Sequence, residues 1–214
     1  MARLLFTGKA FGTFDLQNGD KAKRSLQKTL AISNVNYMKQ VHGNKIEIIS
    51  EAANDLPEAD GLVTNQRSIA LAVQVADCLP LLLQSEVAVA AVHVGRKGLL
   101  NGVAVAAVAA LKQFGATKIS GVVGPHICGN CYEVDKAMFD EITHQHPATK
   151  STGQNLNLFA GLAAQISEIP LINLNICTLE NPNYFSFRRG GESGRQVGVI
   201  CLLYTSDAAD EEDS

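Results

Sequence analysis

Side chains that could do chemistry gather in five short segments, most of them at the ends of apolar runs. The segments are QVHG (40–43), VADCLP (75–80), AVHVGRKG (91–98), GPHICGNCYEV (124–134) and NPNYFSFRRGGESGR (181–195). They contain imidazole and thiol groups, which bind zinc, and guanidinium and ammonium groups, which bind phosphate. The sequence therefore offers the parts of a metal site and of an anion site.

The candidate metal ligands are His42, Cys78 and His93. Two histidines and a cysteine would hold zinc with one position left open for water or substrate. Each residue also has a simpler interpretation, because a lone His before Gly is commonly a turn residue and a free Cys packs as a small hydrophobic group. The wide intervals between the three match no compact zinc-finger pattern, so the spacing alone leaves both interpretations open.

Two pairs of cations are candidates for substrate binding. Arg96 and Lys97 follow a strand-like run and Gly95, and a glycine turn between a strand and a helix is a common anion-binding arrangement. Arg188 and Arg189 follow the aromatic YFSF run, and a guanidinium fork suits a phosphate or a ribose. The alternatives are a solvated surface turn for the first pair and a charged strand edge for the second.

Cys128 and Cys131 form a CxxC motif in a stretch that looks like a loop. A structural zinc site would need two further ligands. We interpret the two residues as loop thiols, with a redox pair or a second metal site as the alternatives. The chain has five cysteines, and this odd number favours reduced thiols over a disulfide framework.

Composition limits the class of protein. Hydrophobic residues make up 46% of the chain, enough for a sizeable core. No apolar run is long enough for a membrane span, and the N-terminus lacks the features of a secretory signal, so we expect a cytoplasmic protein with no membrane partner. Outside the last twelve residues the chain is close to neutral, which argues against nucleic-acid binding.

The last twelve residues, LYTSDAADEEDS, hold five acids and no base, and the whole chain has a net charge of −3. We expect residues 203–214 to form a disordered acidic tail, with a non-native extension as the alternative. Residues 1–202 contain no repeat and no low-complexity linker. We therefore expect them to form one domain.

The elements that must position these segments alternate along the chain. Strands are predicted over 37–41, 45–50, 61–64, 69–75, 79–84, 87–94, 118–123, 172–178 and 197–203. Helices are predicted over 21–32, 99–114, 136–146 and 155–166, the first and third with Asp20 and Asp135 as N-caps. Several strands are apolar on both faces, which indicates an α/β or α+β fold with mixed sheets that are covered on both sides.

In this order, the five segments resemble the motifs of the bacterial YfiH-like proteins. This family is named for multicopper polyphenol oxidase (laccase) activity and is also described as zinc-containing purine nucleoside phosphorylases; the human macrophage protein FAMIN belongs to the same group. VADCLP, HVGRKG, GPHICGNCYEV and YFSFRR are similar to the family's TADCLP, HAGWRG, GPAIG..CYEV and FFSYRR. The match covers about residues 4–202, and its motifs are specific only in combination.

The resemblance implies a single four-layered α/β/β/α domain with mixed sheets. It also implies that His42, Cys78 and His93 bind a metal, with zinc expected and copper as the alternative. The implied reaction is phosphorolysis of adenosine, inosine, guanosine and methylthioadenosine by phosphate, with adenosine deamination at the same site.

For this chemistry Lys97 is the first candidate to hold the phosphate, and Arg188 or Arg189 is the second. Deamination also needs a carboxylate that carries a proton without binding the metal. Asp77 is our candidate, although in a regular strand its side chain would point away from Cys78.

Two departures from the family pattern bear on substrate preference. Arg96-Lys97 replaces the Trp-Arg of HAGWRG, and the family's SLNL segment appears as TFDL at residues 13–16.

Two other enzyme classes stay open. One is copper-dependent oxidation of phenols, although five histidines in the whole chain are few for a multicopper centre. The other is a cysteine hydrolase in which His93 or His42 activates Cys78 as the nucleophile. A non-enzymatic binding protein would not need polar groups clustered at so many strand ends.

Overall fold

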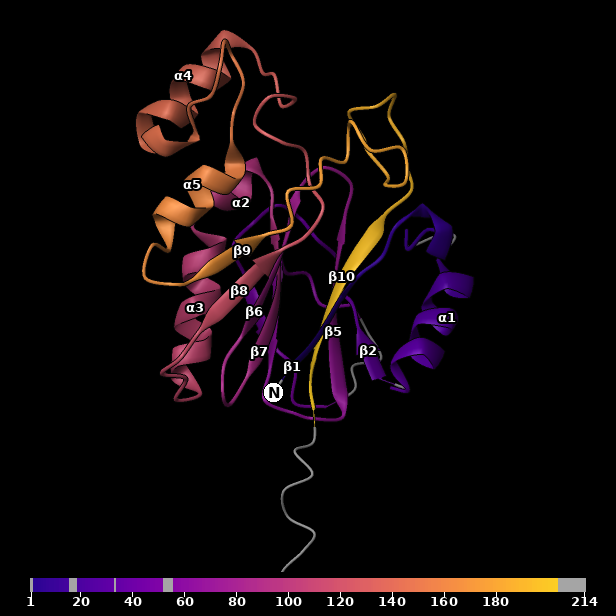
Figure 1. Ribbon diagram of the computed structural model, residues 1–214. Helices are drawn as coiled ribbons and strands as arrows, with labels where there is room; N and C mark the ends of the chain where they lie inside the picture. Colours follow the sequence, from indigo (N-terminus) through magenta and orange to yellow (C-terminus); the bar gives the residue numbers. More distant parts are fainter. Residues whose placement is uncertain (1, 16–18, 33, 52–55, 204–214) are drawn as a thin grey trace, which may run out of the picture.

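The computed structural model describes residues 2–15, 19–32, 34–51 and 56–203. Two β-sheets pack face to face, and helices cover the outer face of each sheet (Figure 1). This arrangement confirms the predicted four-layered α/β/β/α architecture with mixed sheets. No helix among the described residues is long and apolar enough to cross a membrane.

The smaller sheet has four strands. Their order is β1 (Ala2–Phe6), β10 (Gln196–Leu202), β5 (Ile69–Val75) and β2 (Asn34–Asn36). Only the β2–β5 pair is parallel. Helix α1 (Asp20–Leu30) lies on the outer face and buries Ala22, Leu26 and Leu30 there.

The larger sheet has six strands. Their order is β3 (Ile46–Ile48), β4 (Gly61–Thr64), β7 (Val89–Val94), β6 (Leu79–Gln84), β8 (Ser120–Val123) and β9 (Leu171–Asn173). Its outer face carries α2 (Arg96–Leu100), α3 (Val103–Gln113), α4 (Lys136–Gln145) and α5 (Leu158–Gln165) (Figure 1). Two short 3₁₀ helices, η1 (Lys9–Phe11) and η2 (Pro147–Thr149), lie in the connections.

The central strands are buried on both faces, as their continuous apolar runs predict. In β6, Leu82 faces the other sheet, while Leu81 and Leu83 pack against the helices. In β5, alternate residues face the larger sheet, namely Ile69, Leu71, Val73 and Val75, whereas Ala70 and Ala72 face α1. This burial fixes the strand register, because a slip of one residue would exchange the two faces.

The predictions for 61–64, 69–75 and 79–84 match β4, β5 and β6 in full. The strand predicted over 37–41 is wrong: that segment is a loop in which Lys39 alone pairs with Glu58. Strands β1 and β2 were not predicted, since both are short and gain their pairing from distant parts of the chain.

The single helix predicted over 99–114 is two helices. They are separated at Gly102, whose φ of +74° lies in the left-handed region that favours glycine. Asp20 does not cap α1 but is its first residue, and the N-cap is Gly19. Asp135 does cap α4, since its side chain accepts a hydrogen bond from the backbone N–H of Met138.

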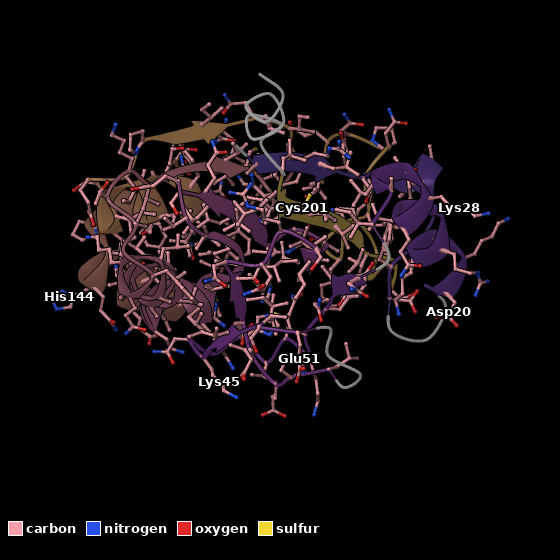
Figure 2. All side chains as sticks on the ribbon, turned by 90° about the horizontal axis from the view of Figure 1, so that it is seen from below. Asp20, Lys28, Lys45, Glu51, His144 and Cys201 are labelled. Carbon is pink, nitrogen blue, oxygen red and sulfur yellow. The ribbon has the colours of Figure 1, made fainter. Side chains whose placement is uncertain are left out.

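Many charged side chains project outwards from these layers. Asp20 and Lys28 project from α1, and His144, predicted as a surface residue, projects from α4, whereas Cys201 lies inside (Figure 2). Of the predicted acidic tail, all residues after Leu203 lie outside the described residues, as does Leu16 of the TFDL segment.

Candidate metal centre and substrate pocket

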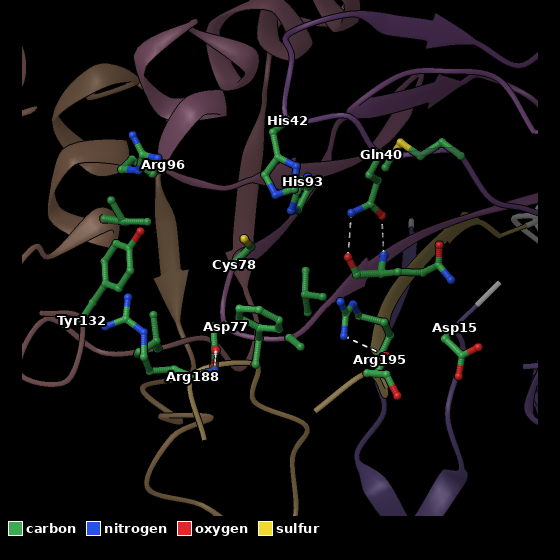
Figure 3. Close-up of a pocket in the computed structure, with 18 of the residues that line it drawn as sticks. Asp15, Gln40, His42, Asp77, Cys78, His93, Arg96, Tyr132, Arg188 and Arg195 are labelled. Carbon is green, nitrogen blue, oxygen red and sulfur yellow. Dashed lines mark hydrogen bonds between the residues drawn. The ribbon is translucent and has the colours of Figure 1, made fainter. Parts of the chain in front are cut away.

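The structure brings the three predicted metal ligands together. The donor atoms of His42, Cys78 and His93 lie within 4.8 Å of one another (Figure 3). Cys78 directly precedes β6, and the antiparallel register places that end of β6 beside the end of β7 that carries His93. His42 comes from the loop before β3, and its ring packs edge-on against the His93 ring, with 4.8 Å between the centroids.

The buried carboxylate of Asp60 holds two of these ligands. Its Oδ1 atom lies 2.8 Å from Nδ1 of His93. The same carboxylate accepts hydrogen bonds from the backbone N–H groups of Val41, His42 and Gly43. Asp60 therefore fixes both the His93 ring and the loop that carries His42. The sequence analysis did not identify Asp60. The feature that could have indicated it is its place directly before the predicted strand 61–64.

Electrostatics favour a metal-binding form of Cys78. Burial alone would raise the pKa of its thiol, but the charge of His93 and hydrogen bonds with His42 and His93 outweigh this effect and lower the pKa to about 6. Burial alone would lower the pKa of His93, but Cys78 and Asp60 raise it to about 9. A thiolate is the form of cysteine that binds metals.

The donor set fits a metal with nitrogen and sulfur preference. Asp60 occupies Nδ1 of His93 and leaves Nε2 for a ligand bond, which is the usual carboxylate–histidine–metal arrangement. Two imidazoles and a thiolate suit zinc with an open fourth position. The same donors also accept copper.

A glycine allows this close approach of the ligands. A Cβ atom at Gly95 would lie 3.1 Å from Sγ of Cys78 and 3.2 Å from Cδ2 of His42. Both distances are shorter than ordinary carbon contacts, so a larger residue would displace one ligand. Gly95 is also the N-cap of α2, which has only five residues.

The three candidate ligands line a pocket of about 790 Å³. Around them, the pocket is bordered by Asp15, Gln40, Arg96, Tyr132, Arg188 and Arg195 (Figure 3). These residues come from segments far apart in the sequence, and Figure 3 shows Arg96, Tyr132 and Arg188 on one side of the ligands and Gln40, Asp15 and Arg195 on the other.

The first wall is cationic. The guanidinium carbon of Arg188 lies 5.0 Å from the centre of the Tyr132 ring, and its Nη1 donates to the carbonyl oxygen of Glu133. Burial raises the pKa of Tyr132, while the charges of Arg96 and Arg188 act in the opposite direction. Two guanidinium groups therefore flank one aromatic ring at the pocket.

The opposite wall is held by backbone contacts. The Gln40 side chain makes two hydrogen bonds with the backbone of Gln74, at 2.8 and 2.9 Å. Nη1 of Arg195 donates to the carbonyl oxygens of Ser193 and Gly194, each at 2.8 Å. Both side chains are thus fixed at the pocket edge.

The turn between β5 and β6 determines where Asp77 points. Asp77 has φ of +84°, a left-handed conformation that costs energy for a non-glycine residue. Its Oδ1 accepts from the hydroxyl of Thr178 and its Oδ2 from the backbone N–H of Arg188, each at 2.7 Å. Asp77 lines the pocket, but both of its oxygens are bonded to the segments that form the pocket wall.

The structure separates the four predicted cations. Arg96 and Arg188 line the pocket, whereas Lys97 is exposed and is not among the lining residues. Arg189 is also absent from the lining: it donates to the carbonyl oxygens of four residues and to Glu192. The four carbonyl acceptors belong to Thr178, Leu179, Asn181 and Tyr184. Arg189 therefore clamps a loop, and Arg96 takes the pocket position predicted for Lys97.

Comparisons with known proteins agree with the fold and the motifs. The family model described as multi-copper polyphenol oxidoreductase laccase matches residues 15–203. A Corynebacterium glutamicum protein named purine nucleoside phosphorylase is 38% identical over 188 residues, which cover 81% of this chain and 76% of that protein. A Streptomyces griseus protein of the same name is 37% identical over 199 residues, covering 86% and 80%.

Solved structures are similar over nearly the whole chain. A Neisseria meningitidis protein of the DUF152 family has a TM-score of 0.82 with 25% identity and covers 95% of each chain. The Bacillus licheniformis protein YfiH has a TM-score of 0.82 with 23% identity, and the match covers 94% of this chain and 92% of YfiH. The two proteins therefore have similar folds.

Proposed function

Because the chain belongs to the multi-copper polyphenol oxidoreductase laccase family and its relatives are named purine nucleoside phosphorylases, we propose that it is a cytoplasmic, zinc-dependent purine nucleoside phosphorylase. The observation that carries the proposal is one pocket of about 790 Å³ in which a His₂Cys donor set lies beside a wall with two arginines. Phosphorolysis needs both a phosphate aimed at the sugar and relief of the charge that develops on the purine.

We assign phosphate binding to Arg96 and Arg188. Their guanidinium groups flank Tyr132 on the same wall, and a pair of planar forks suits the oxygens of a phosphate dianion. The N-terminus of α2 adds little, because the helix has five residues. Arg96 stands where the similar family segment has Trp, so this cation distinguishes the present chain from the usual motif.

We place the nucleoside on the side of Gln40, Asp15 and Arg195. The side chains there offer amide, carboxylate and guanidinium groups for the ribose hydroxyls and the polar edge of a purine. Phe187 also lines the pocket and is 61% exposed, so its ring is available to stack on a base. The substrates proposed are adenosine, inosine, guanosine and methylthioadenosine.

His42, Cys78 and His93 would hold the zinc, with Asp60 orienting His93. When bound, zinc at this site would supply Lewis-acid polarisation and, for adenosine deamination, a bound water with its pKa lowered to about 7. The polypeptide contributes the orientation of both reactants, since its arginines and its opposite wall fix the phosphate and the nucleoside on either side of the ligands.

Deamination is the second activity that we propose for this pocket, and Asp77 is the candidate proton carrier. Its carboxylate is close enough to line the pocket, but it already accepts two hydrogen bonds from Thr178 and Arg188. A role in positioning the pocket wall is therefore the competing proposal for Asp77. The two roles predict different effects of an Asp77→Asn substitution on deamination and phosphorolysis.

Two other activities have a specific observation in their favour. The family description and the His₂Cys donor set favour copper-dependent oxidation of phenols. The Cys78–His93–Asp60 series has the nucleophile–base–orienting-group order of a cysteine hydrolase. The position of His42 favours a metal site over a hydrolase, because a cysteine nucleophile and its histidine base do not need a second histidine within 4.8 Å.

A single assay tests the main proposal. Protein of known metal content is incubated with inosine, with and without inorganic phosphate, and the products are separated. Hypoxanthine and ribose 1-phosphate that form only with phosphate are the expected result. The proposal fails if metal-loaded protein releases no base while copper-loaded protein oxidises a phenol. A Cys78→Ser variant that has the same zinc content as the wild type but no activity would favour the nucleophile.

A further inference from the structure

A second group of potential metal ligands lies apart from the pocket ligands. The donor atoms of Cys128, Cys131, Cys177 and Glu180 lie within 4.8 Å of one another. We propose that these four residues bind a structural zinc ion that joins residues 126–133 to residues 176–181. The CxxC motif alone lacks two ligands, and the fold supplies both of them from a segment distant in the sequence.

Two turns present the four ligands. The backbone N–H of Cys131 donates to the carbonyl oxygen of Cys128 at 3.1 Å, which closes the CxxC turn. The N–H of Asn181 donates to the carbonyl oxygen of Cys177 at 3.0 Å and closes a second turn, Cys177 to Asn181, which contains Glu180. Each turn thus offers two donors three residues apart, which is the spacing of structural zinc sites built from paired turns.

Backbone hydrogen bonds hold the two turns against each other before any metal binds. His126 and Cys177 form a parallel β-bridge. The backbone N–H of His126 donates to the carbonyl oxygen of Ile176 at 3.1 Å, and the N–H of Thr178 donates to the carbonyl oxygen of His126 at 3.0 Å. The backbone N–H of Cys128 donates to Sγ of Cys177 at 3.4 Å. This contact joins the CxxC turn directly to a proposed ligand of the second turn.

The chemistry of the donors selects the metal. Three thiolates and a carboxylate suit zinc, whereas calcium and magnesium prefer oxygen ligands alone. A tetrahedral zinc with bonds of about 2.3 Å to sulfur has its ligand atoms about 3.8 Å apart, so the present spacing needs a contraction of only about 1 Å. Four protein ligands leave no open position, which is typical of a structural rather than a catalytic zinc.

The surroundings shield most of the site from solvent. Cys177 is buried and Cys128 and Cys131 are half-buried, while Glu180 is exposed and closes the site from outside. The guanidinium of Arg189 donates to the carbonyl oxygens of Thr178, Leu179 and Asn181, so a positive charge lies against the turn that carries Glu180. Arg189 also pairs with Glu192, so it offsets only part of the net negative charge of a site with four anionic ligands.

A zinc ion here would act on the substrate pocket through the chain. Tyr132, on the cationic wall, directly follows Cys131. Thr178, which follows Cys177, donates to the carboxylate of Asp77, and the N–H of Ile127 donates to the Asp77 carbonyl oxygen at 3.0 Å. The second zinc would therefore rigidify the segments that form one side of the pocket, independently of which reaction the pocket catalyses.

The test measures bound metal and does not depend on activity. Protein reconstituted with zinc and dialysed is expected to retain two zinc ions per chain in the wild type and one in Cys78→Ser. The double variant Cys78→Ser/Cys131→Ser is expected to retain none. Cobalt(II) in Cys78→Ser should give a thiolate-to-cobalt charge-transfer band, because the remaining ligands include three thiolates, and the double variant should lose it.

Cys201→Ala is the matched control, since Cys201 is buried in β10 and belongs to neither ligand group. It should retain two zinc ions. If Cys131→Ser does not fold, Glu180→Gln at the exposed ligand serves instead and should release its second zinc to a chelator faster. The proposal is overturned if Cys78→Ser retains no zinc, or if wild-type protein purified under reducing conditions contains a disulfide among Cys128, Cys131 and Cys177.

Discussion

The carboxylate of Asp60 lies 2.8 Å from Nδ1 of His93, and the side chains are 0% and 4% exposed. The same carboxylate accepts three backbone hydrogen bonds from the loop that presents His42. Burial would raise the pKa of Asp60, but its hydrogen bonds with His93 and with that loop lower it. One buried, charged acid thus organises two candidate metal ligands that come from different parts of the fold.

Replacing Asp60 with Asn should weaken the metal site more than the fold. The amide keeps one acceptor oxygen but turns an NH₂ group towards donors, and it no longer stabilises His93 by charge. We expect a loss of about 10–100-fold in zinc affinity and a fall of about 1–3 kcal/mol in the free energy of unfolding. Chelator competition and denaturant unfolding of metal-free protein measure the two effects.

The matched control is Glu168→Gln, the same exchange at an exposed acid that pairs with Lys112. It should change neither quantity by more than about 0.5 kcal/mol. Zinc affinity in Asp60→Asn equal to that of Glu168→Gln would show that Asp60 does not support the metal ligands.

Gly95→Ala tests the packing of the ligands. Because the added Cβ would lie 3.1 Å from Sγ of Cys78, we expect at least one ligand to move and zinc to dissociate more readily. The control is Gly115→Ala, where φ is +86° and no atom lies within 4 Å of the added Cβ. That variant should lower the melting temperature through backbone strain but keep its zinc. Equal zinc retention in both variants would contradict the steric argument.

The sequence predicted the parts of the fold that local pattern determines. Strands β4, β5 and β6 are mostly apolar, with a single polar residue at or near the end of each, and their limits could be placed to the residue. Strand β1 could not be predicted, because ARLLF contains a charge and its pairing with β10 joins opposite ends of the chain. The grouping of His42, Cys78 and His93, which the structure shows, was predicted from the resemblance rather than from their spacing.

The substrate residues depend on side-chain direction, which the sequence does not contain. Arg96 and Lys97 are adjacent in the first turn of α2, so their side chains point about 100° apart and only one reaches the pocket. Arg188 and Arg189 are also neighbours in sequence, and only Arg188 lines the pocket. Asp60 was missed because an acid before an apolar strand is also the pattern of an ordinary strand boundary.

Arg96 and Lys97 offer a matched pair of substitutions. Arg96→Gln removes a guanidinium from the pocket wall, and we expect KM for phosphate to rise by about tenfold or more, since a hydrogen bond to a charged group contributes about 1.5–3 kcal/mol. Lys97→Gln removes a charge from the next residue, which is exposed and outside the pocket, and should leave KM unchanged. Steady-state phosphorolysis of inosine at varied phosphate measures both. A larger effect from Lys97→Gln than from Arg96→Gln would instead support phosphate binding by Lys97.

Asp77→Asn separates proton transfer from positioning. If Asp77 carries the proton, the variant should lose adenosine deamination by about 100-fold or more while phosphorolysis persists, because an amide cannot accept and return a proton. If the carboxylate only anchors Thr178 and Arg188, both reactions should fall together by a smaller factor. In one reaction mixture with adenosine, the sum of inosine and hypoxanthine gives the deamination rate, and adenine gives the rate of direct phosphorolysis.

The loop that carries Arg188 should loosen in acid. Hydrogen bonds from Arg189 and Lys9 hold the pKa of Glu192 at about 2, against an ordinary value of 4.5. A lowered carboxylate pKa stabilises the folded protein above the ordinary value, and this contribution is lost as pH falls from 4.5 towards 2. Denaturant unfolding of wild type and Glu192→Gln should therefore give curves that differ at pH 6 and converge in that window. Glu168→Gln should stay parallel to the wild type. If the difference between wild type and Glu192→Gln does not change with pH, Glu192 does not couple protonation to this loop.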